Sequence, residues 1–263
     1  MTTEGSTPHY PPEMLDGAKK VSVGDGLSGL LWTRVRTQLS APARQYLRGT
    51  FPAVAVQAFT ATTEEYWQDW LSDESLDELA GLVIVFDSAG LPVGWVANND
   101  RRFGGRRCFY ANSAGVHPDY QGAGISSTIW RLLIRAAIVK SAPRRLYAVM
   151  RTGNPLVYGA WTTAAGRSGS AWPAPGTPVP EYVRAIAADA AADLGQADRL
   201  DGRTLVVTDA YDDTEAGLWT QRPTSDRTDI DDWFATLLGP RDAIILVVAF
   251  RPIRIMIDEV RRT

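Results

Sequence analysis

Hydrophobic and polar positions near the start of the chain follow the spacing of helices. Apolar residues three and four apart predict a helix over residues 28–49. A threonine cap followed by acidic residues predicts a second helix over residues 62–72. The chain therefore begins with a predicted helical region.

Short apolar runs bounded by turn residues come next and predict strands. The first three cover residues 81–86, 93–98 and 108–116, and the turns DSAGLP and RFGGRR join them. Strands connected by such short turns pair antiparallel, so they predict a meander. A fourth strand is predicted over residues 145–150.

The pattern then changes between helices and strands several times. Apolar residues from Ile125 to Ala137 predict a helix that ends before Pro143, and Asn154 with Pro155 begins another. Further on we expect an irregular stretch at 171–180, a helix over about 180–194, a strand at 204–209, a short helix at 229–239 and a strand at 243–250. This order predicts the α+β class.

Composition limits the possible functions. The chain has 263 residues, 45% of them hydrophobic and 22% charged, which is typical of a soluble globular protein. The net charge of −3 argues against nucleic acid as a partner. No apolar run approaches the ~20 residues of a membrane span, so we expect no membrane association.

The N-terminal segment, the single cysteine and the two histidines bear on cellular location and on metal binding. Residues 1–20 are polar and Pro-rich, which predicts a flexible arm and no secretory signal. Cys108 is the single cysteine, which excludes an internal disulfide and fits a cytoplasmic location. With only His9 and His117 beside it, we expect no metal site.

The stretch VHPDYQGAGISSTIW, residues 116–130, carries the strongest chemical signal. A predicted strand leads through Gly122 and Gly124 into a helix, and this junction presents free backbone N–H groups at a positive helix end. That arrangement binds phosphate or pyrophosphate, although a tight turn alone would also explain the glycines. The spacing matches neither a Walker loop nor a dinucleotide fingerprint.

VHPDYQGAGI resembles the acetyl-CoA-binding motif of the GNAT N-acetyltransferases, Q/R-x-x-G-x-G/A, over roughly residues 80–166. The resemblance implies a mixed, mostly antiparallel central sheet with splayed strands and helices on both faces. We expect residues 21–263 to form a single GNAT-like acyltransferase domain. An inserted Pro-rich and helical segment at about 167–203 is a candidate lid or dimer contact.

The resemblance also implies how acetyl-CoA is held. Its pantetheine arm would pair with backbone between two strands, and its pyrophosphate would meet the glycine loop. The implied binding residues are Ala114, Gly115, Val116, Gln121, Gly122, Ala123, Gly124, Ile125, Ser126 and Asn154. A neutral amine would attack the thioester directly, and an N–H near Val116 would polarise its carbonyl.

The catalytic residues depart from the family pattern. Where similar enzymes often carry a Glu base, this chain has Tyr110, and no carboxylate lies in residues 101–118. Asp100, at the end of the preceding predicted strand, is the nearest candidate. Where they often carry a Tyr acid, it has Trp161, with Tyr158 one turn earlier. We take Tyr158, Asp100 and Tyr110 as catalytic candidates. Core packing is the alternative for Tyr158, and a role in the turn is the alternative for Asp100.

Two functions from different classes follow from these residues. The first is acetyl transfer from acetyl-CoA to an amine of a small molecule, by an enzyme that is a possible homodimer. The second is a non-catalytic CoA-binding or interaction protein, which the missing Glu and Tyr favour. The four arginines of DRRFGGRR either protect a sheet edge or anchor a substrate carboxylate or phosphate. Cys108 is expected to be a buried core thiol.

Overall fold

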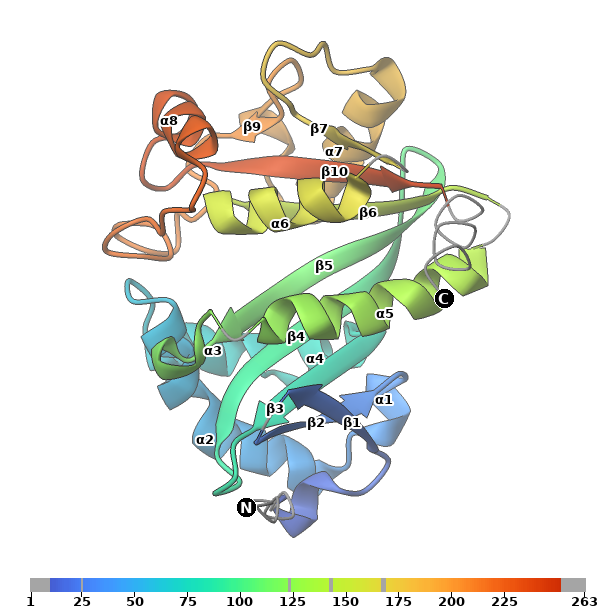
Figure 1. The fold of residues 1–263 in the computed structure, drawn as a ribbon, viewed down its shortest axis with the longest axis vertical. Coiled ribbons are helices and arrows are strands. Elements are labelled where there is room, and N and C mark those ends of the chain that lie inside the picture. The colour runs from blue at the N-terminus through green and yellow to red at the C-terminus, as the bar shows by residue number, and fades with distance from the viewer. Residues whose placement is uncertain (1–9, 25, 123, 142–143, 167–168, 252–263) are drawn as a thin grey trace, which may run out of the picture. The chain divides into compact units, whose positions relative to one another are not determined.

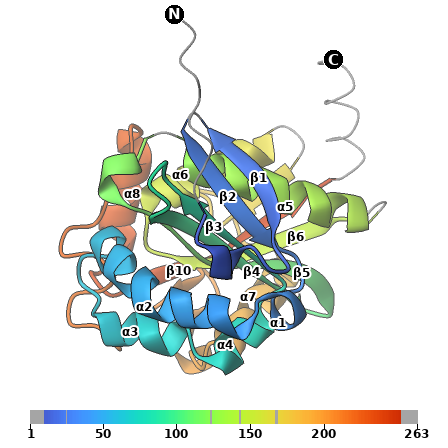
Figure 2. The same cartoon turned by 90° about the horizontal axis from the view of Figure 1, so that it is seen from below.

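The computed structural model describes residues 10–24, 26–122, 124–141, 144–166 and 169–251. The chain folds into two compact units (Figures 1 and 2). Unit 1 runs up to Asn99 and resumes over Asn112–Leu133, and unit 2 comprises Asp100–Ala111 and continues from Ile134. Strands β4 (Pro92–Phe103) and β5 (Arg106–Val116) and helix α5 (Ile125–Ser141) contribute residues to both units.

Unit 1 is built on an antiparallel sheet. Strands β1 (Lys19–Gly24), β2 (Leu27–Trp32) and β3 (Gly81–Phe86) pair in sequence order, and β3 pairs with β4. Helices α2 (Ala41–Ala58), α3 (Glu64–Trp70) and α4 (Asp73–Glu78) gather on one side of these strands (Figure 2). The short helix α1 (Val35–Gln38) precedes α2.

An aromatic cluster forms the core between these helices and β4. Trp95 of β4 lies 4.7 Å from Phe51 and 5.4 Å from Trp67, measured between ring centroids. Successive side chains of a strand point to opposite faces, so Asn98 lies on the other face from Trp95. On that face a Cβ at Gly81, the partner of Asn98 on β3, would lie 3.4 Å from the Leu133 side chain of α5. Helices therefore cover both faces of the unit 1 sheet.

Unit 2 contains a mixed sheet. Strand β6 (Leu146–Thr152) pairs parallel with β5 over Cys108–Tyr110 and antiparallel with β10 (Ala243–Phe250). The other edge of β10 pairs with β7 (Gly169–Trp172) and with β9 (Val206–Val207), which pairs with β8 (Leu200–Asp201). The fold is thus α+β with a mixed, mostly antiparallel open sheet, as predicted.

Helices also cover both faces of the unit 2 sheet. Helix α6 (Pro155–Ala165) and helix α7 (Glu181–Asp193) lie on opposite sides of β10 (Figure 1). Alternate residues of β10, including Ile245 and Val247, share a buried cluster with α7. Phe250 points the other way and contacts Trp161 of α6. Helix α8 (Thr228–Leu237) packs beside α6.

Most predicted elements are confirmed, and one is wrong. Residues 28–49 are not one helix, because Leu27–Trp32 form strand β2 and helices begin only at Val35. Leu30 and Leu31 are compatible with the hydrophobic spacing of a helix and of a strand. The segment forms a strand because it pairs with both β1 and β3. Strand β1, which precedes β2, was not predicted.

Three further segments differ from the expectations. The strand expected at 204–209 shrinks to Val206–Val207, because Leu205 and Asp209 adopt positive φ angles of 60° and 49°. Inside the expected insert, residues 169–172 form β7 and pair with β10. Of the expected arm, residues 1–9 lie outside the described residues, whereas Met14 is fully buried and β1 begins at Lys19.

Candidate active site

Strand β5 changes character along its length. Cys108–Ala111 are buried, whereas Ser113–Val116 are half-buried. This second stretch, in unit 1, contains Ala114, Gly115 and Val116, the residues expected to pair with pantetheine. Partly exposed backbone is what such pairing requires, because a strand must have free N–H and C=O groups to receive an extended ligand.

Gly115 has a structural requirement of its own. A Cβ at this position would lie 2.2 Å from the ring of Trp95, which crosses the strand here and donates from its indole N–H to Ser113 Oγ at 2.9 Å. The glycine is therefore needed for packing within unit 1, whatever ligand lies beside the strand.

The loop after β5 is held by side chains on both sides of the turn. His117 Nδ1 accepts a hydrogen bond from the Asp119 N–H and caps the short helix Pro118–Tyr120. Gln121 Nε2 donates to the Val116 carbonyl at 3.0 Å, and the Tyr120 hydroxyl donates to Asp87 at 3.2 Å. Gln121 thus closes the loop back onto the end of β5.

The two glycines of the loop leave open space in front of the helix. Gly122 and Gly124 have φ angles of 82° and 71°, and a Cβ on either would have no atom within 4 Å. The Gly124 carbonyl accepts the first helical hydrogen bond, from Thr128 at 3.0 Å. Ile125, Ser126 and Ser127 therefore begin α5 with N–H groups that have no helical partner.

These features make the start of α5 suitable for an anion. Ile125 is buried and anchors the helix, whereas Ser126 is half-buried. Free N–H groups at the positive end of a 17-residue helix attract phosphate oxygens. Ala123, the remaining residue predicted in this loop, lies outside the described residues.

Asn154 is confirmed as a helix cap. Its side-chain oxygen accepts from the Leu156 N–H at 2.9 Å, and its own N–H donates to Thr152 Oγ1. Pro155 occupies the first helical position, as predicted. The cap fixes the direction in which α6 leaves β6.

Asp100, the first of the catalytic candidates, is engaged by two cations. Its Oδ2 accepts from Arg107 at 2.5 Å and lies 3.5 Å from the Lys140 ammonium. The side chain remains 41% exposed. A proton arriving at Oδ2 would have to compete with both contacts.

Tyr110, the second candidate, lies in the buried cluster of unit 2. Burial raises the pKa of its phenol to about 12, while the charge of Arg151 lowers it. The side chain is therefore neutral at physiological pH. A neutral phenol donates hydrogen bonds and does not accept a proton, so Tyr110 does not replace the carboxylate of similar enzymes as a base.

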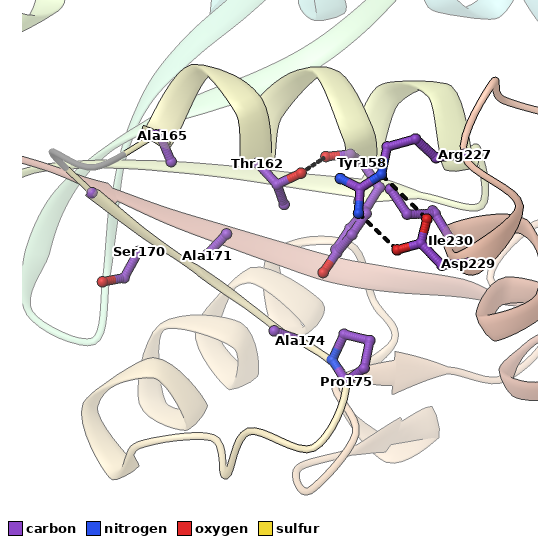
Figure 3. A pocket seen from close by; sticks show the side chains of 12 residues that line it. Tyr158, Thr162, Ala165, Ser170, Ala171, Ala174, Pro175, Arg227, Asp229 and Ile230 are labelled. Carbon is purple, nitrogen blue, oxygen red and sulfur yellow. Dashed lines mark hydrogen bonds and ion pairs between the residues drawn. The ribbon is translucent and has the colours of Figure 1, made fainter.

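Tyr158, the third candidate, faces a pocket of about 330 Å³ (Figure 3). Its hydroxyl donates to the Pro173 carbonyl at 3.0 Å, and burial raises its pKa to about 12. Beside Tyr158, Arg227 and Asp229 form a two-pronged ion pair with distances of 3.3 and 2.7 Å (Figure 3). Tyr158 would have to give up its bond to Pro173 before donating to a thiolate.

The other candidates of the sequence have partners within unit 2. Cys108 is 1% exposed, and burial raises its pKa to about 11, so a buried thiol is confirmed. The four arginines of the hairpin have separate partners. Arg101 pairs with Asp193, Arg102 donates to the Gly105 carbonyl, Arg106 lies over the rings of Tyr147 and Tyr182, and Arg107 pairs with Asp100.

The sequence analysis left Arg151 outside the predicted strand and did not consider it as a candidate. The predicted strand ended at Met150, whereas β6 continues to Thr152. Arg151 follows Tyr147 and Val149 at the spacing of two that places side chains on one face of a strand. Extending the alternation by one step would have found it.

The described residues contain neither a metal site nor a membrane-spanning helix. No group of three His, Cys, Asp or Glu residues among them could hold a metal ion. Within the same ranges, none of the helices has the length and apolar character needed to cross a bilayer.

Comparison with known proteins agrees with the fold. Residues 42–159 match the model of the Acetyltransferase (GNAT) family. Comparison with curated proteins yields no match.

Matches among solved structures include three acetyltransferases. A ribosomal-protein-alanine N-acetyltransferase from Brucella melitensis biovar Abortus 2308 is 18% identical, with 42% of this chain and 72% of that chain covered and a TM-score of 0.30. A GNAT family acetyltransferase from Brucella melitensis in complex with acetyl-CoA is 16% identical, with 40% and 69% covered and a TM-score of 0.33. A GCN5-related N-acetyltransferase from Kribbella flavida is 17% identical, with 56% and 34% covered and a TM-score of 0.36.

Proposed function

We propose that the protein moves an acetyl group from acetyl-CoA to the amine of a small molecule, because residues 42–159 match the model of the GNAT acetyltransferase family. The observation that carries this proposal is the start of α5. Two exposed glycines with positive φ lead into three free N–H groups, and a Cβ at either glycine would point into open space. This geometry suits the pyrophosphate of CoA.

Each N–H group in this loop contributes through its charge-assisted hydrogen bond. Such a bond to an ionised oxygen stabilises binding by roughly 1.5–3 kcal/mol. Two or three of them, with the helix dipole, are enough to hold the pyrophosphate without a lysine. Half-buried residues 113–116 of β5 would then receive the pantetheine arm.

The proposed chemistry is a direct transfer. The lone pair of a neutral amine forms a bond to the thioester carbonyl carbon, and the C–S bond then breaks. The amine nitrogen loses one proton and the CoA thiolate gains one. Most of the rate gain would come from holding the two reactants in attack geometry.

No strong base stands ready to take the proton from the attacking amine. Asp100 is a candidate base, but its Oδ2 already contacts Arg107 and Lys140. Tyr110 is a neutral phenol and can orient the amine only by donating or accepting a hydrogen bond. We therefore propose that water carries the proton from the amine, with Asp100 as its acceptor, and that Tyr158 or water protonates the thiolate.

A non-catalytic CoA-binding protein is the second candidate. It is favoured by the absence of a carboxylate at position 110 and by Trp161, which packs against Phe250 where similar enzymes carry a tyrosine. Both candidates predict acetyl-CoA binding, and only the first predicts turnover.

Two measurements separate the candidates. Calorimetry with acetyl-CoA tests binding, and release of the CoA thiol in the presence of a panel of amines tests transfer, with mass spectrometry to identify the acetylated product. Binding with amine-dependent thiol release supports the enzyme. Binding without release from any amine supports the CoA-binding protein, and absence of binding contradicts both.

A further inference from the structure

Arg151 lies where the parallel pairing of β5 and β6 ends within unit 2. The last pair joins Tyr110 to Val149, and Arg151 is two residues further along β6, on the same face as Val149. Its charge acts on the phenol of Tyr110. Arg151 is therefore near the position at which similar enzymes carry their base.

The guanidinium of Arg151 is held in place by contacts that occupy only some of its N–H donors. Nη1 donates to the Ala210 carbonyl at 2.7 Å, and the planar group lies 4.7 Å from the ring centroid of Tyr211. Gln196 Nε2 donates to the same carbonyl at 2.8 Å. The Tyr211 side chain also takes a hydrogen bond from Arg151. An arginine has five N–H donors in a planar fork, so part of this fork remains available.

The acids around Arg151 are matched with other cations. Asp212 pairs with Arg199 at 2.7 Å, Asp209 with Arg241 at 2.6 Å, and Asp193 with Arg101 at 3.1 Å. The pKa of Asp212 is lowered first by its bond from Arg199 and last by the more distant charge of Arg151. Within the described part of the chain, no carboxylate forms an ion pair with Arg151.

A second arginine of unit 2 shows what a purely structural role looks like. Arg222 donates to the carbonyls of Phe234, Leu238 and Gly239, so its fork is filled by the C-terminal end of α8. Arg151 instead contacts one carbonyl, that of Ala210, and the side chain of Tyr211. The guanidinium of Arg151 is therefore bonded to fewer carbonyls than that of Arg222.

The surroundings of Arg151 favour an anion as its ligand. Arg151 is half-buried, and Tyr110 and Tyr211 beside it are buried and uncharged. A half-buried cation without a counter-ion loses solvation that a carboxylate would restore. The planar fork matches the two oxygens of a carboxylate.

We propose that Arg151 binds a carboxylate of the acceptor, so that the acceptors are small amines that also carry a carboxyl group. This inference rests on the proposed acetyl transfer and names its substrate class. The ring of Tyr211 and the Ala210 carbonyl orient the fork, and Tyr110 lies on the same face. Arg151 is thus a specificity residue that holds one end of the acceptor.

The test uses matched pairs of acceptors that differ only in the carboxyl group. L-phenylalanine is compared with 2-phenylethylamine, and L-lysine with 1,5-diaminopentane, in wild type, Arg151→Gln and Arg151→Lys. Arg145→Gln is the control, because Arg145 is an exposed arginine directly before β6. Circular dichroism and acetyl-CoA affinity verify that each variant is folded.

In wild type and Arg145→Gln, we expect kcat/KM to be at least about tenfold higher for the carboxylate member of a pair, mainly through KM. Arg151→Gln should remove this preference, and Arg151→Lys should keep part of it, since lysine retains the charge without the fork. Equal kcat/KM for both members in wild type, or an undiminished preference in Arg151→Gln, would overturn the inference.

Binding of the same probes, followed by ligand-observed NMR, separates failure of the inference from failure of the proposed function. Arg151-dependent binding of the amino acids without any thiol release would keep the carboxylate site and contradict acetyl transfer. Transfer to amines without a preference for a carboxylate would support acetyl transfer and contradict the carboxylate site at Arg151. If no amino acid binds to wild type, the carboxylate site is refuted, whatever the outcome for acetyl-CoA.

Discussion

The loop at the start of α5 in unit 1 and the surroundings of Arg151 in unit 2 are built in opposite ways. The loop is one contiguous stretch, its glycines are exposed, and its donors are backbone N–H groups. The Arg151 group brings together Tyr110, Gln196 and Tyr211, which are far apart in sequence, and it acts through side chains. A loop of the first kind recognises a part common to many substrates, whereas a cluster of the second kind can discriminate between them.

The largest effect is expected from filling the loop. Gly124→Val should weaken acetyl-CoA binding at least a hundredfold, because loss of two charge-assisted hydrogen bonds costs about 3–6 kcal/mol. Isothermal calorimetry measures the change.

Gly105→Val is the matched control for this substitution. Gly105 has a φ of 69°, close to the 71° of Gly124, and a Cβ there would also meet no atom within 4 Å. Both variants therefore carry a similar backbone strain of roughly 1–2 kcal/mol. An acetyl-CoA affinity of folded Gly124→Val equal to that of Gly105→Val would contradict the role of the loop.

The buried phenol of Tyr110, beside Arg151, should make the free energy of unfolding depend on pH. Burial raises the folded-state pKa of Tyr110 to about 12, above the value of about 10 in the unfolded chain. Below about pH 10 both states keep the proton, and stability is unaffected by this group. Between about pH 10 and 12 only the unfolded chain releases it, so the free energy of unfolding falls by up to about 3 kcal/mol.

Urea denaturation across this pH range, compared between wild type and Tyr110→Phe, measures the contribution. Phenylalanine keeps the ring and has no proton to release, so the variant should lose stability less steeply above pH 10. Parallel curves for the two proteins would show that Tyr110 ionises freely and is not buried as described.

A smaller effect is expected at Tyr158. Tyr158→Phe leaves the Pro173 carbonyl without its donor, which should lower the free energy of unfolding by about 1–3 kcal/mol. Since the hydroxyl is occupied by Pro173, we expect kcat to stay close to wild type. Denaturant titration and steady-state kinetics measure the two quantities.

The opposite kinetic result would change the assignment of Tyr158. A fall in kcat of about 10²–10⁴-fold, with unchanged acetyl-CoA affinity, is the usual loss for a general acid. Such a fall would make Tyr158 the proton donor to the thiolate and would require its hydroxyl to leave Pro173 during turnover.

The smallest effect is expected at Cys108. Cys108→Ala should retain wild-type kcat, because a direct transfer needs no acyl-enzyme, and should lose only about 1 kcal/mol of stability from a small cavity. Incubation with acetyl-CoA followed by peptide mass spectrometry provides a second check. An acetyl group on Cys108, or a folded variant without turnover, would exclude the direct mechanism.

Local patterns predicted much of this molecule correctly. The limits of β3 and β10 agree with two apolar runs, and the cap of α6 follows from Asn154 and Pro155. The glycine loop could also be predicted, since strand, glycines and helix are adjacent in the chain. Each of these features depends on interactions within a few residues.

Other features could not be predicted from local patterns. Residues 28–32 fit a helix as well as a strand, and only pairing with β1 and β3 makes them a strand. Gly115 reads as part of a cofactor-binding strand, yet the ring of Trp95 also requires a glycine there. Both outcomes depend on partners distant in sequence.

The sequence by itself determined the glycine loop before α5, the order of most elements and the absence of a carboxylate at position 110. Tertiary structure alone decided that the Tyr158 hydroxyl binds Pro173, that Asp100 is shared by Arg107 and Lys140, and that Arg151 keeps an available fork. The physical reason is the distance along the chain between the residues that interact. Backbone donors at a helix start follow from neighbouring residues, whereas the partner of a charged or hydroxyl side chain depends on which distant segments pack around it.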